Sequence, residues 1–279
     1  MKPRFTTLAA LILTLALCLT ACGEKTPTYD NALERVLGTG KLVMATNPEW
    51  APMEFENLQA TNEDEKYVGC DIELGRYIAE QLGVELVISP MNFEAVIESV
   101  IQGQADVGIS GLAYKEDRAA STMMAGPYAL GDDQGYQGAL IRVGMEDELA
   151  TLEGINGRPI AVQIASLQLE YAEKYLPDSP ITTISSPIDG VLYLQNGEVD
   201  AFLTASSMGD GFMRNYSDVT MSALKFPTTE GAWVVLKPGE DELYERVQEI
   251  VTEAESSGKF AQWRTEAEAL AEQLGVNAG

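Results

Sequence analysis

The chain has 279 residues, of which 18 are basic and 43 acidic, and its formal net charge is −25. A chain this acidic repels nucleic acid phosphates and anionic lipid head groups, so both are excluded as binding partners. A hydrophobic fraction of 46% is too high for a disordered chain, and the sequence contains no histidine. Because histidine is the commonest general base and metal ligand, we expect a folded protein without a metal or cofactor.

The first residues have the pattern of a secretory signal peptide. Lys2 and Arg4 form a short basic region, and the apolar run 8–19 is shorter than the ~20 residues that a membrane-spanning helix needs. Leu-Thr-Ala then precedes Cys22, an arrangement that resembles a bacterial lipobox. The resemblance implies cleavage of residues 1–21 and acylation, for example with palmitate, of Cys22 as a membrane anchor. The alternative is an ordinary signal peptide with an incidental cysteine.

The mature chain would begin at Cys22 and carry a net charge of 16 − 43 = −27, because the signal peptide removes two basic residues. Residues 22–30 are short, polar and contain a proline, which is typical of a tether. Cys70 would be the remaining cysteine of the body, so no intramolecular disulfide is expected. It lies between apolar residues, and we interpret it as a small buried hydrophobic side chain rather than a reactive thiol.

Apolar runs and amphipathic segments alternate along the first half of the body. The expected elements are a helix over 31–37 ending at Gly38, a strand over 41–45, a helix over 71–82 capped by Asp71 and ended by Gly83, a strand over 84–89, a helix over 93–102 and a strand over 105–110. This alternation predicts a mostly parallel sheet covered by helices.

The same order of elements recurs in the second half. Gly103-Gln104-Ala105-Asp106 lies between a helix and a strand, and Gly197-Glu198-Val199-Asp200 does the same. The expected elements around the second copy are strands over 159–163 and 181–184 and helices over 167–175 and 189–194, followed by a strand over 232–236 and two helices separated by Gly258. We predict two similar lobes: residues 31–134 plus 232–279 form lobe 1, residues 135–231 form lobe 2, and the chain crosses twice between them.

Several segments carry a more specific signal. They are Gly40–Thr46, Trp50–Phe55, Val68–Leu74, Ala105–Leu112 followed by Glu116, Arg118 and Gly126-Pro127-Tyr128, and Ala161–Gln163 followed by Ser166, Gln168 and Glu170. In this order and spacing they resemble the amino-acid-binding proteins of bacterial ABC transporters, the family 3 extracellular solute-binding proteins, over essentially the whole mature chain. The resemblance implies a periplasmic-binding-protein-like α/β fold of type II. In that fold two crossover strands join two lobes, which close on a ligand in the cleft between them.

The resemblance implies that Arg118 binds the carboxylate of the ligand. A guanidinium grips a carboxylate through two charge-assisted hydrogen bonds, which lysine cannot reproduce. The alternative is a surface ion pair with Glu116 or Asp117. Ser166 and Leu167 begin the helix over 167–175, whose free N–H groups and dipole suit a carboxylate, although Ser166 can also act only as a helix cap.

Two aromatic residues correspond to the family positions that enclose the ligand's side chain. Trp50 lies in a polar, proline-flanked loop, where we expect it to form a wall of the cleft. Phe93 begins a helix and can equally belong to the core. Ser110, Gly111 and Ala113 match loop positions whose backbone groups touch the ligand, with alanine replacing the usual serine at position 113.

Ala205 stands where the family has the acid that pairs with the ligand's ammonium group. An ammonium without a counter-charge is costly in a closed cleft. Either another acid takes its place, with Glu49, Asp210 and Glu230 as candidates, or the ligand lacks an α-ammonium. Trp233, near the second crossover, either narrows the site or packs in the core.

The sequence therefore predicts a monomeric, lipid-anchored solute-binding component of an ABC importer, at the cell surface or in the periplasm. It would deliver a polar amino acid or related small carboxylate to a permease. The first alternative is an enzyme of the same fold, such as a periplasmic dehydratase, but we recognise no nucleophile–base arrangement. Further alternatives are a ligand-sensing lipoprotein, which would need a membrane-spanning helix after the lobes, and a lipoprotein that binds a protein partner.

Overall fold

The computed structural model describes residues 28–130, 135–227 and 231–276. The chain divides after Asp30, and the body that begins at Asn31 contains all the elements considered below. The predicted signal peptide, the proposed anchor Cys22 and the candidate acid Glu230 lie outside the described residues. Within the described ranges, no helix combines the length and apolarity needed to cross a membrane.

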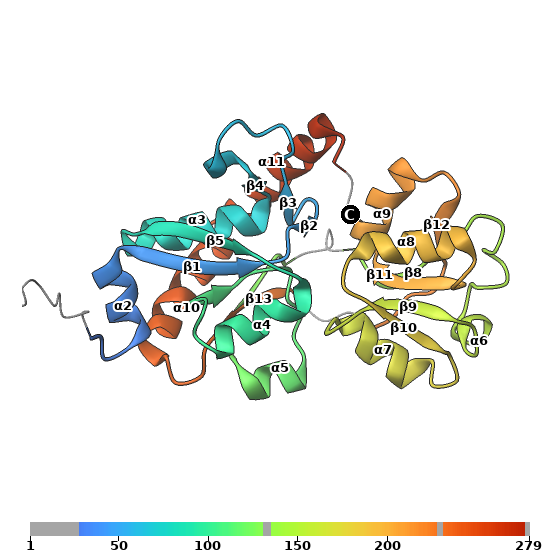
Figure 1. Cartoon of the computed structure of the whole chain (residues 1–279), viewed down its shortest axis with the longest axis horizontal. Coiled ribbons are helices and arrows are strands. Elements are labelled where there is room, and N and C mark those ends of the chain that lie inside the picture. Colours follow the sequence, from blue (N-terminus) through green and yellow to red (C-terminus); the bar gives the residue numbers. More distant parts are fainter. Residues whose placement is uncertain (1–27, 131–134, 228–230, 277–279) are drawn as a thin grey trace, which may run out of the picture. The chain divides into compact units, whose positions relative to one another are not determined.

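The first lobe is built on a five-stranded sheet (Figure 1). Its strands, in spatial order, are β5 (Glu85–Pro90), β1 (Lys41–Thr46), β6 (Val107–Gly108), β13 (Ala232–Leu236) and β7 (Met123–Tyr128). β1 is parallel to β5 and β6, whereas β13 is antiparallel to β6 and β7. The strand that comes last in the chain is therefore inserted inside the first sheet.

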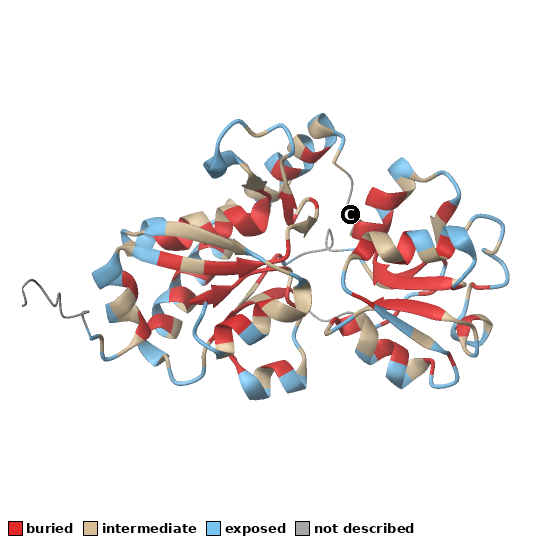
Figure 2. Ribbon diagram, viewed as in Figure 1, coloured by how far each residue is buried: buried red, intermediate tan, exposed pale blue. Residues whose placement is uncertain are grey.

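Helices cover both faces of this sheet, as the buried residues in Figure 2 indicate. One core cluster joins α2 (Ala32–Thr39), α3 (Cys70–Leu82), α10 (Asp241–Ser256) and the start of α11 (Lys259–Leu274) to one face. A second cluster joins α4 (Phe93–Ile101) to the other face. On α10 the buried residues are Leu243, Val247, Ile250, Val251 and Ala254, as the sequence pattern predicts.

A small antiparallel sheet lies over α11 in the same lobe. It consists of β2 (Glu49–Trp50), β3 (Glu54–Glu56) and β4 (Tyr67–Val68), with a short 3-10 helix, η2 (Glu63–Glu65), before β4. Phe55 and Val68 pack against Ala267 and Ala271 of α11. The sequence predicts a loop in part of this region, because two-residue strands carry no detectable alternation.

The second lobe has a five-stranded sheet with the same connectivity. Its strands, in spatial order, are β10 (Ile181–Ile184), β9 (Ile160–Gln163), β11 (Ala201–Ala205), β8 (Gln137–Arg142) and β12 (Val219–Met221). The helices are α6 (Leu152–Ile155), α7 (Leu167–Tyr175), α8 (Pro187–Asn196) and α9 (Ser206–Asn215). In each sheet the fourth strand, β13 or β8, is antiparallel to its neighbours. It is also the first strand that the chain forms after it leaves the other sheet. The connectivity therefore includes two passages between the sheets.

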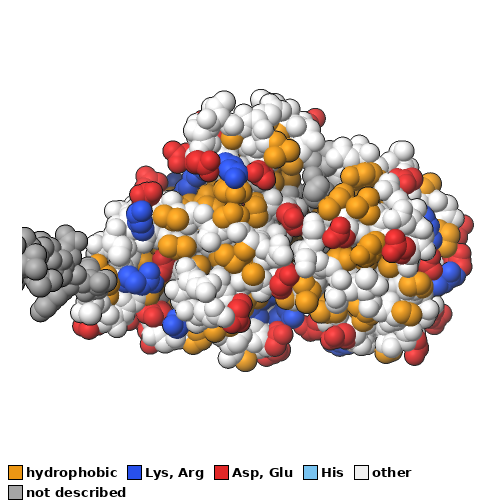
Figure 3. Space-filling view, viewed as in Figure 1, with side chains coloured by type: hydrophobic (Ala, Val, Ile, Leu, Met, Phe, Trp, Pro, Cys, Tyr) orange, Lys and Arg blue, Asp and Glu red, His pale blue; other side chains and the backbone are white. Residues whose placement is uncertain are grey.

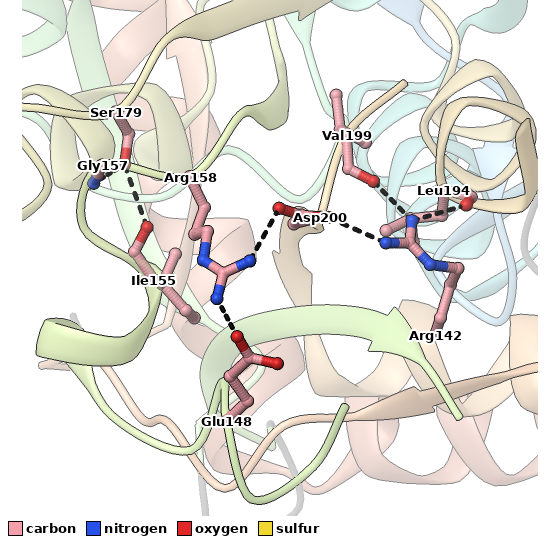
Figure 4. Close-up of polar contacts among 9 residues, drawn as sticks. All are labelled: Arg142, Glu148, Ile155, Gly157, Arg158, Ser179, Leu194, Val199 and Asp200. Carbon is pink, nitrogen blue, oxygen red and sulfur yellow. Dashed lines mark hydrogen bonds and ion pairs between the residues drawn. The ribbon is translucent and has the colours of Figure 1, made fainter. Parts of the chain in front are cut away.

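The repeated Gly-x-x-Asp turns place an aspartate at the same point of each lobe. Asp106 accepts the backbone N–H of Val43 on β1 at 2.8 Å and pairs with Arg35. Asp200 pairs with Arg142 at 2.8 Å and with Arg158 at 3.5 Å (Figure 4). Each carboxylate thus holds in place the turn that leads into the central strand of its sheet, β6 or β11.

The arginines around Asp200 are held from several sides. Arg142 also donates to the carbonyl oxygens of Leu194 and Val199, at 2.8 and 2.7 Å, and Arg158 also pairs with Glu148 (Figure 4). This network lies at the ends of β9 and β11 and ties α8 to the sheet. It is a structural network, and none of its charged residues lines the cavity described below.

Several expected bounds are wrong. The helix expected over 189–194 is α8, which runs from Pro187 to Asn196, and the strand expected over 105–110 is confined to β6. The first helix continues through Gly38 to Thr39, and Gly40, with φ 70°, ends it. Gly69, not Asp71, precedes the first turn of α3. Asp71 lies inside that turn with 0% exposure, because its carboxylate accepts hydrogen bonds from elsewhere in the lobe. The expected helix 167–175 and the strands 181–184 and 232–236 agree with α7, β10 and β13.

Candidate ligand-binding site

A cavity of about 60 Å³ is lined by residues of both lobes. Seven predicted ligand-binding residues line it: Trp50, Phe93, Gly111, Ala113, Arg118, Ser166 and Leu167. Its other lining residues are Asn47, Glu54, Gln137, Gln163, Gln168, Phe202, Leu203, Thr204, Ala205 and Met208. Two predicted residues, Ser110 and Glu49, lie close by without lining it.

Arg118 is buried on α5 (Glu116–Ser121), with 3% exposure. Its guanidinium donates to the carbonyl oxygen of Ala113 and, at 3.2 Å, to that of Ala165 in the second lobe. Its Nε has no hydrogen-bond partner. Asp117 pairs instead with Lys115, at 3.5 Å. Burial lowers the pKa of Arg118 to about 10, so the side chain is charged at neutral pH and presents a cation to the cavity.

Ser166 is the N-cap of α7, and its hydroxyl oxygen accepts the backbone N–H of Leu169 at 3.2 Å. Both Ser166 and Leu167 are buried and line the cavity. The preceding residue, Ala165, has φ 63°. Its carbonyl oxygen accepts the Arg118 hydrogen bond described above. The start of α7 and the guanidinium therefore meet at one end of the cavity.

The two aromatic residues lie in different surroundings. Trp50 packs against hydrophobic clusters of both lobes, and its indole N–H has no partner. Its ring lies on Gly111, where an added Cβ would be 2.3 Å from a ring carbon. Phe93 is half-buried at the start of α4, packs against the core cluster of that helix and also lines the cavity. Gly111 is thus required because the indole occupies the space of a side chain.

Ala205 lines the cavity at the end of β11. Its polar neighbours in the lining are neutral: Thr204, Gln137, Gln163 and Gln168. Gln168 donates to the side-chain oxygen of Gln137, so the amides are oriented by one another. These amides were not predicted to bind the ligand, although Gln163 and Gln168 lie inside the motif that carries the family resemblance.

Ser110 and Glu49 support the site from behind. Ser110 has 0% exposure; it donates to Glu54 at 2.7 Å and accepts the backbone N–H of Asn47 at 3.0 Å. Glu49 accepts the hydroxyl of Ser186, in the second lobe, at 3.2 Å, and burial raises the pKa of its carboxyl. Asp210 is exposed on α9, away from this cavity. Glu54 was missed, and among the described residues it contributes the one carboxyl side chain of the lining.

The interpretation of Cys70 as a buried hydrophobic residue is confirmed. Its exposure is 0%, its Sγ lies 3.5 Å from the Met53 sulfur, and burial raises the pKa of the thiol well above its usual value. In the part of the chain that the structure describes, no three Asp, Glu, Cys or His side chains gather as a metal site would require.

Comparison with known proteins identifies the family. The profile of the bacterial extracellular solute-binding proteins, family 3, matches residues 42–266. The chain belongs to this family, as its motifs indicate.

Individual relatives agree with this assignment. The arginine-binding extracellular protein ArtP of Bacillus subtilis is 24% identical over 258 residues, which cover 90% of this chain and 94% of that protein. The crystal structure of the amino acid ABC transporter substrate-binding protein AbpA of Streptococcus pneumoniae, bound to L-arginine, is 28% identical with a TM-score of 0.77; the match covers 88% of this chain and 99% of that one. A shorter match is to an enzyme: cyclohexadienyl dehydratase of Pseudomonas aeruginosa is 25% identical over 99 residues, which cover 36% of this chain and 35% of that enzyme. The predicted two-lobe fold of type II and the solute-binding class are thereby confirmed.

Proposed function

We propose that this chain is the solute-binding component of an ABC importer and that it takes up a polar amino acid or a related small carboxylate. The observation that carries the proposal is Arg118, a buried guanidinium that makes hydrogen bonds only to carbonyl oxygens and faces a cavity. Arginine-binding and other amino-acid-binding relatives support the ligand class. Asp117 and Glu170 act on the guanidinium without a hydrogen bond to it, and a carboxylate in the cavity would supply a directly bonded anion.

In this proposal the ligand's carboxylate binds between Arg118 and the start of α7. The free backbone N–H groups of that helix end and the hydroxyl of Ser166 add donors, and the helix dipole favours the negative charge. Trp50 and Phe93 enclose the body of the ligand. The amides and hydroxyl near Ala205 accept or donate hydrogen bonds at its other end.

Closure of the two lobes would bring the binding groups together. Among the residues that the structure describes, side-chain hydrogen bonds that join the lobes include three: Glu94 accepts from Ser185 at 2.9 Å, Glu49 accepts from Ser186 at 3.2 Å, and Arg118 donates to Ala165. The free energy of each of these hydrogen bonds is small compared with that of a hydrophobic interface. A ligand that bridges the lobes can therefore shift the balance between open and closed states. The closed form would be the one that the permease recognises.

We further propose that the protein is exported through the signal peptide 1–21 and anchored by lipid on Cys22, with the folded body acting as a monomer. The lobes then correspond to residues 31–134 plus 232–279 and to residues 135–231. We propose binding without catalysis. The partial match to a cyclohexadienyl dehydratase makes an enzyme the alternative, and incubation of the protein with cyclohexadienyl compounds tests it directly.

The proposal is tested by thermal unfolding of the protein with the protein amino acids, small carboxylates and short peptides. A ligand at ~100 times its dissociation constant adds about 2.7 kcal/mol to the free energy of unfolding, which is readily seen. We expect one class of carboxylate to stabilise the protein, and Arg118→Ala to abolish that shift. Arg246→Ala, an exposed control on α10, should preserve it. If no compound in the panel shifts the transition, the transport proposal fails.

A further inference from the structure

Two buried acids, one in the lining of the cavity and one behind it, take no direct part in the proposed binding of the carboxylate. Glu54 lies on β3 and Asp71 in the first turn of α3, and their exposures are 1% and 0%. The backbone N–H of Asp71 donates to the carbonyl oxygen of Met53, the neighbour of Glu54, at 2.8 Å, and the two carboxyl groups hold the adjacent residues Ser110 and Gly111. The two side chains therefore lie side by side, within reach of a hydrogen bond between them. Two fully ionised carboxylates cannot share such a site without a large electrostatic cost, because neither is solvated.

The pattern of hydrogen bonds distinguishes the two acids. Asp71 Oδ2 accepts the backbone N–H of Gly111 at 2.7 Å and the hydroxyl of Tyr128 at 3.0 Å. Glu54 Oε1 accepts the Ser110 hydroxyl at 2.7 Å. The remaining oxygens, Glu54 Oε2 and Asp71 Oδ1, are both buried and receive no hydrogen bond from any other donor. A proton between these two oxygens would satisfy both.

Asp71 is the better place for the negative charge. It has two donors besides the shared proton, and it lies at the N-terminus of a helix, where the dipole favours an anion. The groups around the pair are the Cys70 thiol on α3, the Tyr128 phenol on β7 and, acting on Cys70 from α11, Arg264. Burial raises the pKa of Glu54 well above its usual value, with a further increase from the charge of Asp71. Glu54 is therefore the acid that keeps the proton.

We propose that Glu54 and Asp71 share one proton, carried by Glu54, and that this proton positions the loop on which the ligand rests. The hydrogen bonds run from the backbone of Asn47 to Ser110, from Ser110 to Glu54, and through the shared proton to Asp71, which holds Gly111. Asn47, Glu54 and Gly111 all line the cavity, and Trp50 rests on Gly111. Loss of the proton places two anions side by side and loosens these segments together. Only the final step, from loop order to ligand affinity, rests on the proposed function.

The test uses the ligand-free protein and three variants. In Glu54→Gln the amide can still donate to Asp71 and accept from Ser110, but it cannot release a proton. Asp71→Asn replaces the acceptor of the Gly111 N–H by a group with fewer acceptor sites. Glu56→Gln is the matched control, because Glu56 lies on the same strand with its side chain 44% exposed.

Infrared difference spectroscopy at neutral pH should show a protonated carboxylic acid that Glu54→Gln removes and Glu56→Gln preserves. The hydrogen-exchange protection factor of the Gly111 amide should fall at high pH in the wild type and in Glu56→Gln, remain constant in Glu54→Gln, and fall roughly tenfold or more in Asp71→Asn. A wild-type spectrum without the acid band, or a Glu54→Gln protein whose Gly111 protection follows the wild-type pH dependence, would overturn the proposal. If Asp71→Asn does not fold, the two glutamate variants still decide it. Because no ligand is used, failure here is distinct from failure of the transport proposal.

Discussion

Replacement of Arg118 by alanine separates ligand binding from the stability of the fold. Burial lowers the pKa of Arg118 to about 10, so placing this cation in the ligand-free protein costs about 3 kcal/mol. The variant relieves this cost but loses the hydrogen bonds to the carbonyl oxygens of Ala113 and Ala165. At about 1.5–3 kcal/mol for each bond from a charged donor, the two lost bonds are together worth about 3–6 kcal/mol, so the relieved cost offsets half of the loss or more. We therefore expect the free energy of unfolding of the ligand-free protein to fall by about 0–3 kcal/mol.

Binding should respond very differently. Two charge-assisted hydrogen bonds to a carboxylate are together worth about 3–6 kcal/mol, so Arg118→Ala should raise the dissociation constant by roughly 10²–10⁴-fold. Arg118→Lys keeps the charge without the planar fork and should recover only part of the loss. The assay is calorimetric titration with the compound that gives the largest thermal shift in the panel, beside urea unfolding without it. Binding within about threefold of wild type in Arg118→Ala would refute the assignment of the carboxylate to this guanidinium.

Three further predictions follow from the geometry. Gly111→Ala should destabilise the protein by about 1–3 kcal/mol more than Gly40→Ala in urea unfolding, because both glycines have positive φ but only at Gly111 does the new Cβ meet the Trp50 ring. Ala205→Asp should raise affinity for α-amino acids over their deaminated counterparts in competition titrations, whereas Ala261→Asp, on the exposed face of α11, should leave the ratio unchanged. Burial raises the pKa of Asp71 from 3.8 to about 6, so the folded state holds more protons than the unfolded one, and the stability present below pH 3.8 is lost as pH rises through about 6. As pH rises from 3.8 to above 6, urea unfolding should show that the wild type loses free energy of unfolding relative to Asp71→Asn. A difference between the two proteins that stays constant over this range would contradict the assignment of this titration to Asp71.

The elements most accurately predicted from the sequence are those with long, regular patterns. The face of α10 and the bounds of α7 could be derived because their apolar spacing follows the helical repeat and a capping serine or glycine marks an end. The repeated aspartates Asp106 and Asp200 predicted the doubled layout, and both fasten a central strand. The short strands β2, β3 and β4 were missed because two or three residues do not define a period.

The site itself was only partly accessible from the sequence. Arg118 and Ser166 stand out because their chemistry and their motif agree, and both line the cavity. Asp71 was expected to cap a helix, since an aspartate before an apolar repeat usually does so. Its true partners, Gly111 and Tyr128, are 40 and 57 residues away along the chain, and no local pattern indicates them.

The shared proton and the alanine at position 205 bear on the same question, the charge of the ligand. If Glu54 is protonated, then Arg118 is the one charged side chain among the described residues that line the cavity. A ligand with a carboxylate and no ammonium would neutralise that charge, whereas a zwitterion would bring a second cation that the neutral amides of Gln137, Gln163 and Gln168 can solvate only through hydrogen bonds. Because Glu54 can become an anion only by giving up the proton that orders its own loop, it is a poor counter-ion for an ammonium. The relative affinity for an amino acid and its deaminated analogue therefore reports directly on the charge that this cavity accepts.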